Sequence, residues 1–155
     1  MKNLLAILVL TWSNFAVADA INPVVEFSFP HDVAMSAYQN KQSCNTADGR
    51  WSDGVCFFNG SDTVEIKAQG SDYRIDIFTV RTNGTHCQIE GAGIAVDNNQ
   101  IKIARQSDED RMTVICEVIV KFSDKDTVSV SNNGKCTSYC GAEGILEIKA
   151  AKRVQ

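Results

Sequence analysis

The residues of this chain that could do chemistry are its six cysteines and two histidines. Cys136 and Cys140 lie in a glycine-rich segment that ends at Gly144. His86 directly precedes Cys87, and a histidine beside a thiolate can activate it as a nucleophile. That chemistry requires a reduced thiol, whereas an even number of cysteines predicts disulfides if the chain is exported, as the N-terminal pattern described next indicates. We therefore predict structural roles for all six cysteines.

The N-terminus has the pattern of a secretory signal peptide. Lys2 precedes an apolar run over residues 4–10, and small residues follow up to Ala20. The apolar run is too short to cross a bilayer as a helix. The sequence therefore predicts a signal peptide over residues 1–20 and a single β domain over residues 21–155, in a periplasmic or secreted protein without stable membrane insertion.

Motifs for other chemistries do not occur in the sequence. With only His31 and His86, and no matched pairs of closely spaced cysteines, a zinc site is not expected. The Gly-x-Ser-x-Gly elbow and the His-Glu-x-x-His motif are absent as well. The net charge of −4 comes from interleaved acids and bases, which does not favour nucleic acid as a partner. We predict a protein that is not an enzyme and needs no cofactor or metal.

Alternation of apolar and polar residues organises the exported part of the chain, and this period of two is typical of strands with one buried face. The pattern predicts strands over residues 25–29, 63–67, 73–77, 86–96, 101–103, 114–122, 128–130 and 145–149. Tight turns separate them, as at Asn132-Asn133-Gly134. Eight or nine short strands with almost no helix predict an all-β fold, a small antiparallel β-barrel or sandwich. We favour the barrel, because closure removes exposed strand edges.

Several local features interrupt this pattern. Pro30 is predicted to end the first strand, followed by a short helix over residues 33–38 that Asp32 could cap. The polar stretch 39–53 is expected to leave the sheet. Residues 59–61, Asn-Gly-Ser, predict a turn, and the two glycines in 91–93 predict a bulge or sharp bend.

Six cysteines allow fifteen disulfide connectivities. Cys44 and Cys56 enclose a loop around Trp51, and we favour that pair. Cys136 and Cys140 are close enough to pair within a turn, which leaves Cys87 for Cys116. If the strand between those two cysteines lies flat in the sheet, they are about two strand spacings apart, beyond disulfide reach. Either bending relieves this distance, or Cys87 or Cys116 pairs with the C-terminal segment.

Three stretches taken together resemble a known group of proteins: residues 82–91, Cys116 in a long strand, and residues 136–144, Cys-Thr-Ser-Tyr-Cys-Gly-Ala-Glu-Gly. This order is similar to small bacterial periplasmic proteins with a C-terminal Cys-x-x-Tyr-Cys-Gly-x-x-Gly segment, several of them grouped with periplasmic lysozyme inhibitors. The resemblance covers roughly the C-terminal half. The better-defined inhibitors of animal-type lysozyme carry a Ser-Gly-x-x-Tyr loop, which this chain lacks.

The resemblance implies a non-enzymatic binding protein that inhibits lysozyme or another peptidoglycan-cleaving enzyme. We expect Tyr139 to be the anchor in a protein partner, with Ser138 and Glu143 as hydrogen-bonding neighbours. A basic lysozyme would suit the acidic surface. The alternative is an envelope structural or toxin-immunity protein in which the same segment has no inhibitory role. The sequence does not define the oligomeric state.

Overall fold

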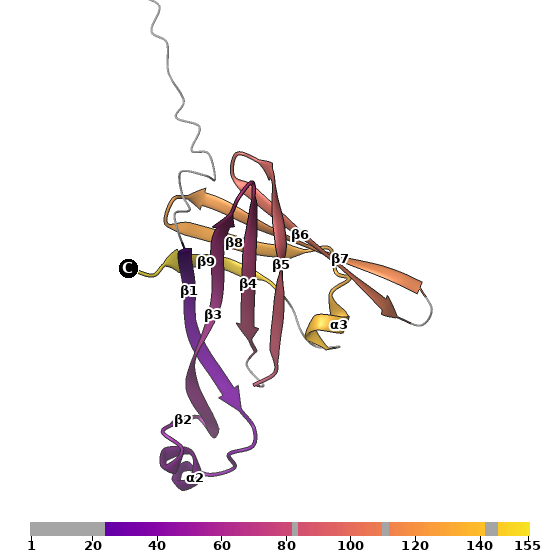
Figure 1. The fold of residues 1–155 in the computed structure, drawn as a ribbon. Helices are drawn as coiled ribbons and strands as arrows, with labels where there is room; N and C mark the ends of the chain where they lie inside the picture. The colour runs from indigo at the N-terminus through magenta and orange to yellow at the C-terminus, as the bar shows by residue number, and fades with distance from the viewer. Residues whose placement is uncertain (1–23, 82–83, 110–111, 142–145) are drawn as a thin grey trace, which may run out of the picture.

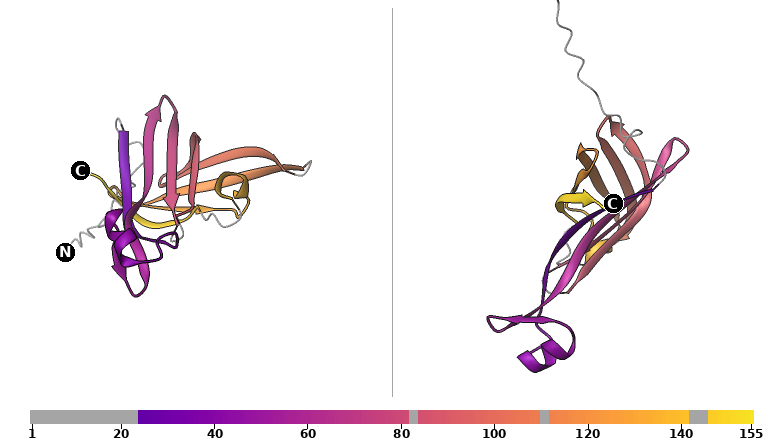
Figure 2. Two further views of the ribbon diagram at one scale, coloured as in Figure 1. Left: turned by 90° about the horizontal axis from the view of Figure 1, so that it is seen from below. Right: turned by 90° about the vertical axis from the view of Figure 1, so that its left-hand side faces the viewer.

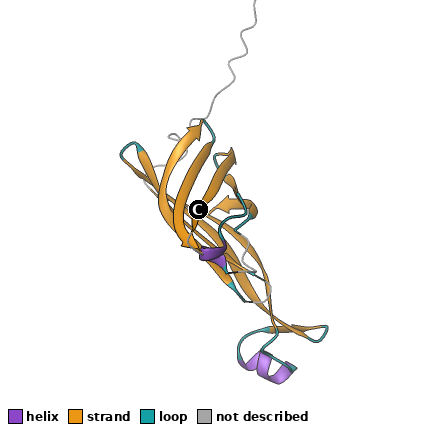
Figure 3. Ribbon diagram, turned by 90° about the vertical axis from the view of Figure 1, so that its right-hand side faces the viewer, coloured by secondary structure: helices purple, strands orange, loops and turns teal. Residues whose placement is uncertain are grey.

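The computed structural model describes residues 24–81, 84–109, 112–141 and 146–155. The predicted signal peptide lies outside these ranges. The described chain is almost entirely strand, with two short helices outside the sheet (Figures 1 and 3). The strands are β1 (Val24–Met35), β2 (Arg50–Ser52), β3 (Val55–Gln69), β4 (Asp72–Val80), β5 (His86–Asp97), β6 (Gln100–Glu109), β7 (Met112–Asp124), β8 (Thr127–Asn132) and β9 (Ile148–Arg153). The helices are α2 (Lys41–Thr46) and α3 (Thr137–Cys140).

Eight of these strands form a closed antiparallel barrel. The order is β1-β9-β8-β7-β6-β5-β4-β3, and pairing between β1 and β3 closes the ring. The remaining strand, β2, adds to the outer part of β3. The predicted all-β barrel is thus confirmed. Closure joins β1 and β3, which would otherwise form the two exposed edges of the sheet.

The inward residues of the strands fill the barrel with apolar side chains. They follow the predicted period of two, since Phe27, Ile66 and Ile75 are each separated from the next buried residue by one outward residue. The largest fully buried side chains are Phe27, Ile66, Ile75, Ile77, Ile89, Ile101, Ile103, Leu146, Ile148, Val64, Val118 and Val120. The barrel therefore has a packed interior over most of its length, as expected for eight strands.

Strand β5 changes partner in its middle, at Gly93. Residues from His86 to Gly93 pair with β4, and those from Gly93 to Asp97 pair with β6. A Cβ atom at Gly93 would lie 2.6 Å from Ile75 Cδ1 and 2.7 Å from Ile101 Cγ2, so only glycine fits this corner. The bulge predicted at residues 91–93 is not found there, because β5 pairs with β4 in unbroken register from His86 to Gly93. The register shift of β5 falls later, between Ala95 and Asp97.

A two-stranded arm extends from one end of the barrel. It continues the pairing of β1 with β3 as far as Met35 with Cys56, while the backbone pairing of β1 with β9 is limited to Phe27 and Ser28 (Figure 1). The predicted strand end at Pro30 and the helix over residues 33–38 are therefore wrong. Proline is tolerated here because this part of β1 has left the main sheet, and edge strands accommodate a missing N–H.

Residues 59–61 also lie in this arm, within β3, so the predicted turn there is wrong. A Cβ atom at Gly60 would overlap Val33 Cγ2, and the glycine thus allows β1 to approach β3. Pairing of Asn59 and Gly60 with β1 thus overrides the local turn preference of Asn-Gly.

The tip of the arm holds the polar stretch 39–53, which leaves the barrel as predicted (Figure 2). Asn40 caps α2 by accepting the backbone N–H of Ser43 at 2.9 Å. β2 then returns along β3, and a disulfide joins Cys44 to Cys56 with Cα atoms 5.6 Å apart. This predicted disulfide is confirmed, and it closes the tip of the arm.

A second arm is formed by the outer halves of β6 and β7, which pair with each other from Ala104 with Glu117 to Glu109 with Met112 (Figure 1). The helix α3 lies beside the base of this arm. None of the helices in the described ranges has the length and apolar character needed to cross a membrane.

Candidate functional site

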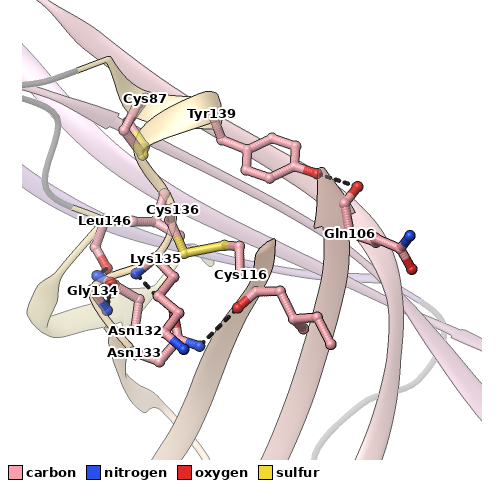
Figure 4. Close-up of a disulfide and its surroundings, with 12 residues drawn as sticks. Cys87, Gln106, Cys116, Asn132, Asn133, Gly134, Lys135, Cys136, Tyr139 and Leu146 are labelled. Atoms are coloured by element: carbon pink, nitrogen blue, oxygen red, sulfur yellow. Dashed lines mark hydrogen bonds between the residues drawn. A yellow bond between two sulfur atoms is a disulfide. The ribbon is translucent and has the colours of Figure 1, made fainter. Parts of the chain in front are cut away.

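The C-terminal segment that contains α3 is attached to the barrel by two disulfides. Cys140 is bonded to Cys87 on β5. Cys136 is bonded to Cys116 on β7 (Figure 4). The predicted pairs Cys136–Cys140 and Cys87–Cys116 are therefore wrong. Because β6 separates β5 from β7 in the sheet, Cys87 and Cys116 are about two strand spacings apart, beyond the reach of a disulfide. The segment reaches both strands and supplies one cysteine to each.

Tyr139 lies on this segment but faces the protein. Its ring is partly buried against the apolar core. Its hydroxyl donates to the backbone oxygen of Gln106 on β6 at 3.3 Å (Figure 4). The side chain thus connects the segment to the base of the second arm. Because the ring is partly buried and the hydroxyl is hydrogen-bonded, Tyr139 supports the segment and does not protrude as an anchor for a partner.

The other two predicted contact residues differ in position. Ser138 is exposed on α3, next to Tyr139 in the chain. Glu143 lies outside the described residues. Of the three residues predicted to contact a partner, Ser138 is therefore the one that the described structure places on the surface, on a short helix fixed at each end by a disulfide.

A second candidate site occurs at the mouth of the barrel, where β1 and β9 separate. A cavity of about 370 Å³ opens there. Its lining includes Phe29 and His31 from β1, Asp62 from β3, Arg81 after β4, and residues 147–149 at the start of β9. Mouths of small barrels are common positions for ligand sites.

The polar part of this mouth centres on Asp62. Its buried carboxylate contacts His31 Nε2 at 3.1 Å and accepts the backbone N–H of Val80 at 2.8 Å. The other ring nitrogen of His31, Nδ1, lies 3.4 Å from the backbone oxygen of Asp32. The pair thus joins β1, β3 and β4 at the point where the apolar interior ends.

Arg81 lies beside this pair and is held by its backbone. Its N–H donates to Thr85 O and its carbonyl accepts from Gly84 N, both at 2.8 Å. Within the guanidinium, Nε and Nη2 are buried and have no hydrogen-bond partner among the described residues. Both nitrogens are thus enclosed by protein and almost inaccessible to water.

Sequence reasoning missed this mouth, although the signal was present. Extending the period of two beyond the apolar residues places His31 after Phe29, Asp62 before Val64, and Arg81 after Ile77 and Thr79. Each inward series ends in a polar residue at the same level of the barrel. Recognising that required the register between β1, β3 and β4, which the sequence alone does not provide.

The cysteines have no free thiol that could take part in catalysis. All six are bonded to one another, so the thiol of Cys87 is oxidised and does not form a catalytic dyad with His86. Three disulfides fit an extracytoplasmic or secreted protein. Among the described residues, no group of three or more His, Cys, Asp and Glu side chains is arranged to hold a metal ion.

No protein-family model matches this chain, and neither a curated protein nor a solved structure matches it.

Proposed function

We propose that this chain is a non-catalytic binding protein of the periplasm or extracellular space, and that its partner is a peptidoglycan-cleaving enzyme such as a basic lysozyme. The observation that carries the proposal is the double attachment of the C-terminal segment, through Cys136 and Cys140, to two different strands. A segment fixed in this way loses little conformational entropy when it binds, which favours recognition of a protein surface.

In this proposal Ser138 contacts the partner and Tyr139 positions it. The hydroxyl of Tyr139 already donates to Gln106, and its ring packs on the core, so its contribution is to hold α3 in place. The net charge of −4 favours association with a basic enzyme. Such attraction acts mainly on the association rate and weakens as salt is added.

The test measures lysis of cell walls by basic lysozymes in the presence of the oxidised protein. We expect inhibition at micromolar concentrations, with matching binding in calorimetry. Ser138→Arg should abolish inhibition because it adds bulk at the contact, whereas Ser71→Arg, at the exposed turn between β3 and β4, should retain it. Undiminished lysis together with no heat of binding would contradict the proposal.

A second candidate function follows from the position of Tyr139. Its packing and its hydrogen bond to Gln106 also suit a segment whose only role is to brace the barrel of an envelope structural or toxin-immunity protein. This alternative predicts that Tyr139→Ala lowers stability, and that Ser138→Arg leaves every partner captured from an envelope extract unchanged. A partner that the wild type captures and Ser138→Arg loses would exclude it.

A further inference from the structure

The outer surface of strands β5, β6 and β7 carries exposed aliphatic side chains. Ile94 and Val96 on β5 are 52% and 47% exposed, and Ile115 on β7 is 50% exposed. Ile119 lies on the same side of β7 as Ile115, because alternate residues of a strand share a face. Three of the five large apolar side chains that are exposed in the described part of the chain thus lie on these strands, and a gathering of this kind marks a contact site.

The register between the strands places these side chains close together. Ile94 pairs with Lys102, and Lys102 pairs with Ile119, so the three residues form one row across the sheet. Along β7, Glu117 lies between Ile119 and Ile115. Adjacent strands are about 5 Å apart, so the row spans about 10 Å from β5 to β7. We refer to the surface formed by Ile94, Val96, Lys102, Ile115, Glu117 and Ile119 as the outer β5–β7 face.

The C-terminal segment is attached to the other side of these strands. Its disulfide partner Cys116 is fully buried and lies between Ile115 and Glu117 in the chain. Because successive side chains of a strand point to opposite faces, the outer β5–β7 face is turned away from this disulfide. An inference about the face therefore does not depend on the contact proposed above for Ser138.

The charges of the outer β5–β7 face match those of a second copy of the chain. Lys102 Nζ lies 3.1 Å from Glu117 Oε1, and both side chains remain partly exposed. An ammonium group has three donors and a carboxylate has two oxygens, so each group can take a second partner. A two-fold axis between the two residues would bring Lys102 of each copy beside Glu117 of the other. The surrounding apolar side chains would then be buried without leaving either charge unpaired.

A basic enzyme suits this face less well than a second copy does. The face contains one acid and one base, so it has no excess of negative charge, and a basic surface would meet Lys102 with a like charge. Two copies of a chain with a net charge of −4 repel each other overall, which favours contact where the charges balance.

We propose that two copies of this chain associate through the outer β5–β7 face, around a two-fold axis between Lys102 and Glu117. The face spans three strands, which is a small area for a protein interface, so the dimer forms reversibly and depends on protein concentration.

Sedimentation equilibrium of the oxidised wild-type protein measures this association over a range of concentrations, and we expect a monomer–dimer equilibrium. Ile94→Glu places an unpaired charge in the apolar part of the contact and should raise the dissociation constant by about tenfold or more. Val24→Glu is the matched control, because Val24 is 46% exposed on β1, on the opposite side of the ring from β6. This variant should associate like the wild type.

Charge reversal tests the two-fold arrangement. Across the axis, Lys102→Glu brings negative charges together and Glu117→Lys brings positive charges together, so neither variant alone should dimerise. An equimolar mixture of the two variants should dimerise, because each copy then carries the charges that the other lacks. Such a gain would also show that both variants are folded.

Three results would overturn the proposal: a wild type that stays monomeric at every concentration, a mixture of the charge-reversed variants that does not associate, and equal weakening by Val24→Glu and Ile94→Glu. Binding of a basic lysozyme by a monomeric wild type, lost in Ile94→Glu, would assign the face to an enzyme instead of a second copy.

Discussion

The Asp62 carboxylate accepts the backbone N–H of Val80 at 2.8 Å, just beyond the last backbone pair of β3 and β4, Thr63 with Phe78. A side chain thus continues the ladder where the two strands diverge at the barrel mouth. Because a buried N–H without an acceptor is costly, this contact stabilises the open end of the barrel.

We expect Asp62→Ala to lower the free energy of unfolding by about 1–3 kcal/mol, because it leaves the Val80 N–H without its acceptor. Asp62→Asn retains an acceptor oxygen and should lose less. Urea denaturation with the disulfides intact measures both variants. Equal losses for the two would show that the charge, and not the acceptor, provides the stabilisation.

The disulfide connectivity makes a prediction about peptide mapping. Trypsin does not cleave between Cys136 and Cys140, so both stay in the peptide 136–149. The observed pairing links that peptide to 82–102, through Cys87, and to 112–121, through Cys116. Mass spectrometry of a non-reduced digest should therefore find these three peptides joined. A separate pair of 82–102 with 112–121 would contradict the connectivity.

Removal of the two C-terminal disulfides should have unequal effects. Cys87 and Cys140 are 53 residues apart, and Cys116 and Cys136 are 20 apart. On the chain-entropy model the first contributes about 4 kcal/mol and the second about 3 kcal/mol, because the longer loop restricts the unfolded chain more. Paired replacement of each disulfide by two serines, followed by denaturant unfolding, compares them. The reverse order would indicate that the unfolded chain is not the main source of the stabilisation.

Substitution at the corner of β5 tests its packing. A Cβ atom at Gly93 would contact Ile75 and Ile101 too closely, so Gly93→Ala should lower the free energy of unfolding by about 1–3 kcal/mol. The neighbouring Ala92 is exposed, and Ala92→Ser serves as the control with little expected change. Thermal unfolding of the two variants gives the comparison. Similar stability in both would mean that the corner can widen without loss.

The turn between β7 and β8 predicts a dependence on pH. The backbone N–H of Asp126 donates to Asp124 at 2.8 Å, and together with a hydrogen bond from the Thr127 side chain it lowers the pKa of Asp124. A carboxylate with a lowered pKa stabilises the fold above its unfolded pKa of about 3.9, and this contribution is lost as the pH falls through the folded value. Asp124→Asn should therefore destabilise the protein at pH 7 and have less effect near pH 3. The same difference at both pH values would contradict this account.

Local information was sufficient for much of the barrel. The alternation around Phe27, Ile75 and Val118 reflects the two faces of a strand, and it identified buried residues before any partner strand was known. The Cys44–Cys56 disulfide was predictable as well, because the two cysteines close a short loop. These features depend on residues close together in the sequence.

Other features depended on pairing between distant residues. β1 continues through Pro30 because β3 pairs with it as far as Met35 and Cys56, and no local pattern near residue 30 contains that information. The same holds for Cys87 and Cys140, which the closed sheet and the returning C-terminal segment bring together.

By itself, the sequence determined the strand content, the buried faces and the oxidised state expected of the cysteines, since these follow from local periodicity and composition. Only the tertiary structure decided which cysteines pair, that Tyr139 packs inward, and that His31, Asp62 and Arg81 meet at one barrel mouth. The reason is that the register between strands sets the distance between residues far apart in the chain, and a sequence read along its length does not contain that register.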